Sequence, residues 1–229
     1  EGLNTIGIGA FFDCYKILEL EIPKTITKVE RGAFYECRGI KTLRWNAIEA
    51  VCEVNDNDIV YPFTKSKNLT DVIFGESVNK IPNYLLARCK SINKILIPDN
   101  VTTIGSNAFL ECSGLLSVTI GKNVKTIGYN AFNKTIKLVE VINKSDINIE
   151  KGSQSAGGVA YYALNVKKDG ESDIINQNGY LFFNADETNY LLGYIGDETQ
   201  LTLPDDYNKQ KYEIYNYAFY NNQKIQSVT

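Results

Sequence analysis

The sequence contains no histidine, and this absence restricts the chemistry of the chain more than any residue that is present. Without histidine there is no Ser-His or Cys-His nucleophile pair and no histidine-ligated metal site. The five cysteines include no CxxC pair, and the small net charge of −3 provides no basic footprint for nucleic acid. No apolar run approaches the ~18 residues of a membrane-spanning helix, and no targeting segment is found. We therefore expect no cofactor, no bound nucleic acid and no membrane insertion.

The chain does contain an internal repeat with a period of 23 residues, whose most regular copy runs from Ile97 to Ile120. An apolar pair marks the same position of each copy: Ala10-Phe11, Ala33-Phe34, Leu85-Leu86, Ala108-Phe109 and Ala131-Phe132. Three residues after four of these pairs stands Cys14, Cys37, Cys89 or Cys112. A fixed period in the twenties is typical of a solenoid, in which each coil buries its apolar side chains only against the neighbouring coils.

Each copy combines two kinds of apolar spacing. Leu115, Val118 and Ile120 alternate as in a short strand, and a proline such as Pro98 ends the strand because it cannot donate a ladder hydrogen bond. The apolar residues between positions 104 and 112 have the spacing of one face of a short helix. The pattern predicts an α/β solenoid with ~23-residue coils, a parallel strand ladder on one face and short helical turns on the other.

The repeat pattern IPxxVTxIGxxAFxxCxxLxxVxI resembles the leucine-rich repeats of BspA-like bacterial cell-surface proteins, also called the treponemal type. The resemblance covers residues 1–143 and 201–229. It implies a right-handed leucine-rich-repeat superhelix and a non-catalytic, adhesin-like module that binds protein. It also implies an extracellular, cell-surface location, with a host or neighbouring-cell surface protein or an extracellular-matrix protein as the partner.

The repeat pattern divides the chain into three segments. Residues 1–143 are predicted to form about six leucine-rich repeat coils, with a loop insertion at 47–60. Residues 144–200 are predicted to be a non-repeat, β-rich insertion with a hairpin, since two aromatic runs flank a polar turn near residues 184–189. Residues 201–229 resume the repeat. Neither end shows a polar cap, so we expect a piece of a longer protein whose signal and anchor lie outside it.

Three features could indicate a chemical role, but for each of them the sequence pattern favours a structural role. Trp45 occupies a core position of the repeat, which predicts a packed side chain rather than a sugar-stacking platform. The repeated cysteines are expected to be buried thiols, whereas Cys52 in the insertion is the candidate for an exposed thiol. The acidic run at residues 53–58 lacks the glycine and the distal glutamate of an EF-hand, so no metal site is predicted.

The outward side of the strand ladder is the candidate binding surface. Two columns of residues are expected to point outward: Glu19, Thr42, Asp71, Lys94, Ser117 and Glu140 in the first, and Glu21, Arg44, Ile73, Leu96, Thr119 and Ile142 in the second. Ile73, Leu96 and Ile142 are apolar where the core does not require it, which indicates a protein-binding patch. The alternative is that β-branched residues simply suit a strand, or that a neighbouring insertion covers them.

Three functions remain open from the sequence. The first is the adhesin-like binding module, and the second is a structural spacer of a longer surface protein with no ligand of its own. The third is a glycosidase that uses two carboxylates from Glu19, Glu21, Asp71 and Glu140, but the pattern shows no cleft and no aromatic stacking pair at the ladder. We therefore expect a protein that is not an enzyme.

Overall fold

The computed structural model describes residues 2–54, 60–220 and 222–229. Internal contacts divide the chain into two compact units, Glu1–Gly170 and Glu171–Thr229, which we call the repeat unit and the C-terminal unit. None of the described helices is long and apolar enough to span a lipid bilayer.

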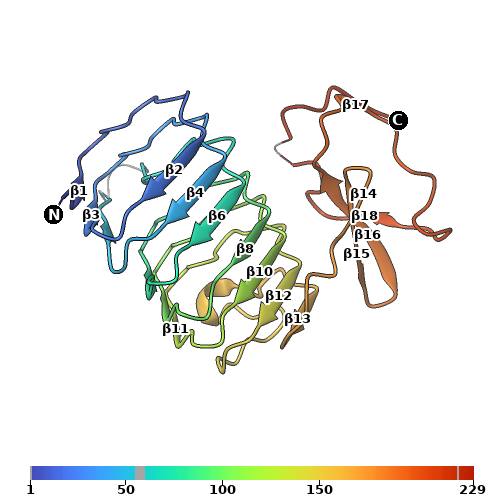
Figure 1. The fold of residues 1–229 in the computed structure, drawn as a ribbon. Helices are drawn as coiled ribbons and strands as arrows, with labels where there is room; N and C mark the ends of the chain where they lie inside the picture. The colour runs from blue at the N-terminus through green and yellow to red at the C-terminus, as the bar shows by residue number, and fades with distance from the viewer. Residues whose placement is uncertain (1, 55–59, 221) are drawn as a thin grey trace. The chain divides into compact units, whose positions relative to one another are not determined.

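The repeat unit is a β-solenoid of stacked parallel strands, as the 23-residue period predicts (Figure 1). One side carries the longer strands: β2 (Glu19–Ile22), β4 (Thr42–Trp45), β6 (Asp71–Phe74), β8 (Lys94–Leu96), β10 (Ser117–Ile120), β12 (Glu140–Asn143) and β13 (Asn165–Lys167). They form two parallel sheets, β2-β4-β6 and β8-β10-β12-β13, and β6 lies next to β8. Because neighbouring coils present the same residue type at the same position, each strand pairs in register with the next.

A second ladder of two-residue strands follows the longer strands around each coil. It consists of β1 (Thr5–Ile6), β3 (Lys28–Val29) and β5 (Val51–Cys52), followed by β7 (Lys80–Ile81), β9 (Thr103–Ile104) and β11 (Thr126–Ile127). All of its pairs are parallel. Hydrogen bonds therefore join successive coils on two sides of the hydrophobic core.

Stacked aromatic side chains mark the centre of the core. The rings of Phe11, Phe34 and Phe63 stack in succession with centroid distances of 5.2 and 4.9 Å, and those of Phe109 and Phe132 stack at 4.8 Å. Trp45 is fully buried, which confirms that it is a packing residue. The apolar repeat positions thus form one continuous hydrophobic cluster, as the repeat register requires.

The prediction of short helical turns is wrong. Residues 106–111 form consecutive turns, and η1 (Ala156–Gly158), a 3-10 helix, is the single helix among the described residues. Asn107 and Glu111 both have φ of 57°, which interrupts helical hydrogen bonding. The N–H groups of Asn107, Phe109 and Glu111 donate to carbonyls of the next coil at 3.0, 2.8 and 2.9 Å. Bonds between coils therefore replace the bonds of a helix.

The predicted loop insertion at 47–60 is partly a member of the stack. Val51 and Cys52 form β5, which pairs with β3, and Ala47 and Ala50 are buried. Cys52 is 5% exposed, so the prediction of an exposed thiol there is wrong. Residues 55–59 of the acidic run lie outside the described residues, and within the described part of the chain no cluster of three metal-ligating side chains is found.

The stack also continues beyond residue 143, where the repeat was expected to stop. Strand β13 pairs with β12, and the N–H of Phe132 donates to the carbonyl of Gly157 at 2.9 Å, so another coil follows and the repeat unit ends at Gly170. In this coil Gly157 stands at the position of the alanine of the Ala-Phe pair, and its backbone lies close to the preceding coil. A Cβ on Gly157 would lie 2.6 Å from the carbonyl oxygen of Gly128.

The C-terminal unit has a sheet and a hydrophobic cluster of its own. Its sheet order is β14 (Ile175–Gln177), β15 (Tyr180–Ala185), β16 (Thr188–Tyr194) and β18 (Glu213–Ile214). Strands β15 and β16 form the antiparallel hairpin that the sequence predicts. Strands β17 (Gln200–Leu201) and β19 (Ser227–Val228) form a parallel pair, as in a solenoid coil. The cluster is built on Phe182, Leu191 and Leu201 with neighbouring tyrosines.

Candidate functional site

The strand register of the repeat unit places the predicted outward residues in two columns. Glu19 pairs with Thr42 and Thr42 with Asp71, while Lys94 pairs with Ser117 and Ser117 with Glu140. The second column follows the same ladder two residues further along each strand: Glu21, Arg44, Ile73, then Leu96, Thr119 and Ile142. Side chains two residues apart on a strand share a face, so both columns lie on one face of the sheets.

The four predicted residues of β10 and β12 are buried, contrary to the expectation that they face solvent. They are Ser117, Thr119, Glu140 and Ile142, at 1, 6, 0 and 1% exposure. The Glu140 carboxylate accepts a hydrogen bond from Ser117 Oγ at 2.7 Å and lies 3.5 Å from Lys167 Nζ. Hydrogen bonding and a countercharge offset the cost of burying a carboxylate, and the alternation of a strand gives no sign of this burial.

The remaining residues of the two columns form the surface that we call the strand face: Glu19, Glu21, Thr42, Arg44, Asp71, Ile73, Lys94 and Leu96. Thr42 is half-buried and the other seven are exposed. Ile73 is 44% and Leu96 55% exposed. These two apolar side chains lie on the adjacent strands β6 and β8, flanked by charged residues.

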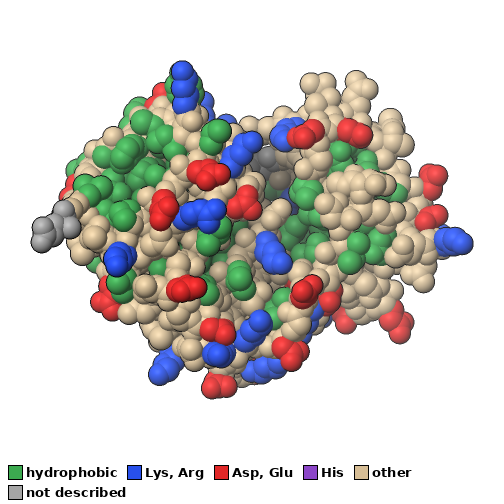
Figure 2. All heavy atoms as spheres, viewed as in Figure 1, with side chains coloured by type: hydrophobic (Ala, Val, Ile, Leu, Met, Phe, Trp, Pro, Cys, Tyr) green, Lys and Arg blue, Asp and Glu red, His purple; other side chains and the backbone are tan. Residues whose placement is uncertain are grey.

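The charged residues of the strand face differ in whether they have a partner among the described residues, and Asp71 accepts a hydrogen bond from Thr70 Oγ1 at 2.7 Å. Among the described residues, Glu19, Arg44 and Lys94 have no ion-pair partner. The Glu21 carboxylate accepts a hydrogen bond from Asn46 Nδ2 at 2.9 Å. Figure 2 shows acidic and basic side chains interspersed over the strands, beside hydrophobic side chains gathered on the N-terminal coil. The strand face therefore offers both signs of charge around a small apolar centre.

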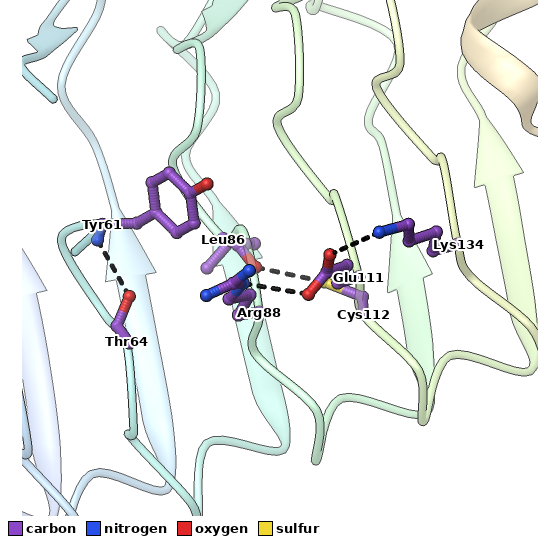
Figure 3. Close-up of polar contacts among 7 residues, drawn as sticks. All are labelled: Tyr61, Thr64, Leu86, Arg88, Glu111, Cys112 and Lys134. Atoms are coloured by element: carbon purple, nitrogen blue, oxygen red, sulfur yellow. Dashed lines mark hydrogen bonds and ion pairs between the residues drawn. The ribbon is translucent and has the colours of Figure 1, made fainter. Parts of the chain in front are cut away.

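The turn side carries a charge ladder that the sequence analysis missed: Asp13, Glu36, Lys65, Arg88, Glu111 and Lys134, one from each coil, all with φ between 57° and 66°. Lys65 Nζ lies 2.7 Å from Glu36 Oε1, and Glu111 contacts both Arg88 Nε at 2.9 Å and Lys134 Nζ at 3.1 Å (Figure 3). The recurrence of charged residues two positions after each aromatic slot is the signal that could have revealed this ladder. It joins neighbouring coils.

The ladder changes the titration of its carboxylates. Hydrogen bonds from Lys65 and Arg38 hold the pKa of Glu36 below its ordinary value. Burial alone would raise the pKa of Glu111, but Lys134 and Arg88 outweigh it and the net pKa is lowered. Both carboxylates are thus held ionised and paired, which favours a structural role over proton transfer.

The cysteine thiols are structural groups. All five cysteines are free, and Cys37, Cys89 and Cys112 are buried in the repeat core. Cys112 Sγ donates to the carbonyl of Leu86 in the preceding coil at 3.1 Å (Figure 3), and Cys37 Sγ bonds to the carbonyl of Phe11 in the same way. Burial raises the pKa of Cys37 to about 11 and that of Cys112 to about 12. These thiols lack the thiolate character that a nucleophile needs.

Comparison with known families supports the repeat assignment. Residues 1–54 and 60–156 match the family described as the BspA type leucine-rich repeat region, in six copies. No curated protein matches the chain.

Comparison with solved structures finds bacterial leucine-rich repeat proteins. A T. pallidum leucine-rich repeat protein is 19% identical over 67% of this chain and 70% of that chain, with a TM-score of 0.49. A leucine-rich repeat protein from Bacteroides ovatus is 22% identical over 61% and 40% of the two chains, with a TM-score of 0.47. A leucine-rich cell surface protein from Faecalibacterium prausnitzii is 18% identical over 99% and 64%, with a TM-score of 0.41.

Proposed function

Because this chain belongs to the BspA type leucine-rich repeat family, we propose that it is a non-catalytic, adhesin-like binding module of a bacterial cell-surface protein. Its partner is a protein of a host or neighbouring cell surface or of the extracellular matrix. The strand face of the repeat unit is the proposed contact surface. The observation that carries the proposal is the exposure of Ile73 and Leu96 beside Glu19, Arg44 and Lys94, which have no ion-pair partner among the described residues.

A partner protein on the strand face would cover its apolar centre and pair with its charges. Burying two exposed apolar side chains removes them from water, and the surrounding charges select a partner of complementary pattern. Arg44 pairs across the ladder with Ile73, so a guanidinium stands beside the apolar centre. Arginine beside a small apolar centre is typical of residues that dominate binding energy at protein interfaces.

Catalysis is less well supported by the same residues. Of the four carboxylates in the glycosidase hypothesis, Glu140 is fully buried and hydrogen-bonded to Ser117. A glycosidase needs two carboxylates that flank one sugar-binding cleft at a defined separation. We therefore propose binding without chemistry for the strand face.

The experiment measures binding of the purified 229-residue chain to immobilised mammalian fibronectin, laminin and collagen by surface plasmon resonance. The triple variant Ile73→Ala, Leu96→Ala and Arg44→Ala is expected to weaken binding at least about tenfold, as for central interface residues. Val51→Ala is the matched control, because Val51 is an exposed β-branched strand residue that lies off the strand face. Binding that the triple variant leaves unchanged would exclude the strand face.

The alternative is a structural spacer in a longer surface protein with no ligand of its own. The observation that favours it is the coil-to-coil charge ladder, whose ion pairs join neighbouring coils. Absence of binding to all three matrix proteins would contradict the adhesin proposal for these partners and favour the spacer.

A further inference from the structure

A second surface of the repeat unit, away from the strand face, contains a cavity of about 320 Å³. Its lining residues come from the turns of two successive coils: Tyr129, Asn130, Asn133, Lys134, Gln154, Gly157, Gly158, Tyr161 and Tyr162. The first four belong to the coil that follows β11, and the others lie in and around η1, which packs beside β11. The volume lies at the lower end of the range of ~300–1,000 Å³ that is typical of small-molecule sites.

Two of the three tyrosines that line this cavity are exposed. Tyr129 is 78% and Tyr161 44% exposed, and Tyr161 meets Tyr162 edge to face with a centroid distance of 4.8 Å. The equivalent position holds Ile8, Arg31, Asn83 and Ser106 in other coils, and Ile8 is 66% exposed. The position thus faces solvent, and the stack does not require an aromatic ring there.

Apart from Lys134, the polar side chains that line the cavity carry no charge. In residues 2–54, 60–220 and 222–229, no hydrogen bond is made by the side-chain amides of Asn130, Asn133 or Gln154. Lys134 is the single charged residue of the lining, and its ammonium group is paired with Glu111 at 3.1 Å. The cavity thus offers hydrogen-bond donors and acceptors from side-chain amides, while its one charged group is already paired with Glu111.

The backbone holds the cavity open. Gly157 and Gly158 have φ of 65° and 78°, a conformation that favours glycine. Gly157 must lack a side chain because of its close approach to Gly128, whereas a Cβ on Gly158 would meet nothing nearer than 3.9 Å. Two consecutive glycines therefore leave the wall of the cavity without side chains opposite Asn133.

We propose that this cavity binds a neutral saccharide, with the tyrosine rings stacking on the apolar C–H face of a sugar ring. Sugar hydroxyls both donate and accept hydrogen bonds, and the three side-chain amides can do the same. The exposed rings supply apolar area at little conformational cost. The site is separate from the strand face, so its occupation does not depend on the function proposed for that surface.

The test is isothermal titration calorimetry of the 229-residue chain with maltotriose, cellotriose and chitotriose. At least one trisaccharide is expected to bind, with Tyr129→Ala weakening it about tenfold or more through loss of the stacking ring. Tyr129→Phe keeps the ring and retains most of the affinity, whereas Asn133→Ala weakens binding by removing an amide. Thermal midpoints of all variants establish that the fold is intact.

Tyr15→Ala is the matched control, since Tyr15 is 59% exposed in the first coil and lies outside the cavity. Its affinity should equal that of the parent chain. Failure of all three saccharides to bind at millimolar concentration would overturn the proposal. Binding that survives Tyr129→Ala unchanged would also overturn it, because the sugar would then occupy another site.

Discussion

Replacing Phe109 by alanine should destabilise the repeat unit far more than the same replacement at Phe12. Phe109 is fully buried and stacks on Phe132 at 4.8 Å, so its truncation removes contacts within its own coil and with the neighbouring coil. Truncating a buried phenylalanine costs about 3–5 kcal/mol. Phe12 also stacks on an aromatic neighbour, Tyr35 at 5.6 Å, but is 58% exposed. Its truncation should cost about 1 kcal/mol or less.

Urea denaturation followed by tryptophan fluorescence measures this difference. The single tryptophan, Trp45, is fully buried in the repeat unit, so its emission reports that unit rather than the C-terminal one. With a denaturant slope of about 1–3 kcal/mol per molar urea, Phe109→Ala should lower the midpoint by about 1 M or more. A shift no larger than that of Phe12→Ala would refute the stacked-core reasoning.

Two further predictions concern the thiols and the charge ladder. In the native chain at about pH 8, a thiol reagent should modify Cys14 rapidly and the four buried cysteines only after unfolding; rapid reaction of two or more thiols would contradict their burial. Because the pKa of Glu111 is lowered by folding, its stabilising effect is present above its unfolded pKa of about 4.3 and is lost as the pH falls through its folded pKa. Glu111→Gln should therefore flatten the fall of the thermal midpoint between about pH 5 and 3, and an unchanged slope would rule out this linkage.

The two proposed sites use different sides and different coils of the repeat unit: the strand face spans β2 to β8, whereas the cavity lies at the turns that follow β11 and surround η1. The strand face presents apolar residues beside charged residues, whereas the cavity presents tyrosines among neutral amides. A solenoid permits this separation because each coil exposes both its strand and its turns, while its core positions stay the same from coil to coil. A variant at Tyr129 and a variant at Ile73 therefore distinguish the two activities.

For the strand face, the sequence pattern predicts the alignment of residues but not their exposure. The spacing of Glu21, Arg44 and Ile73 correctly predicted that these residues share one column of the ladder, because strand alternation and repeat period are properties of the local sequence. The same pattern failed for Glu140 and Ile142, which are buried. The exposure of a strand residue depends on which other parts of the chain pack against it, and the sequence around the strand does not contain that information.

The sequence by itself determined the solenoid, its core positions and the register of the parallel strands. The reason is that a 23-residue period places apolar residues at the same positions of every coil, where they can be buried only against the neighbouring coils. Only the tertiary structure decided that the return path consists of turns rather than helix, since left-handed residues such as Asn107 and Glu111 direct their N–H groups to the next coil. It also decided that the stack continues to Gly170 and that tyrosines from two coils enclose a cavity. Those features arise from contacts between coils, which a single repeat does not specify.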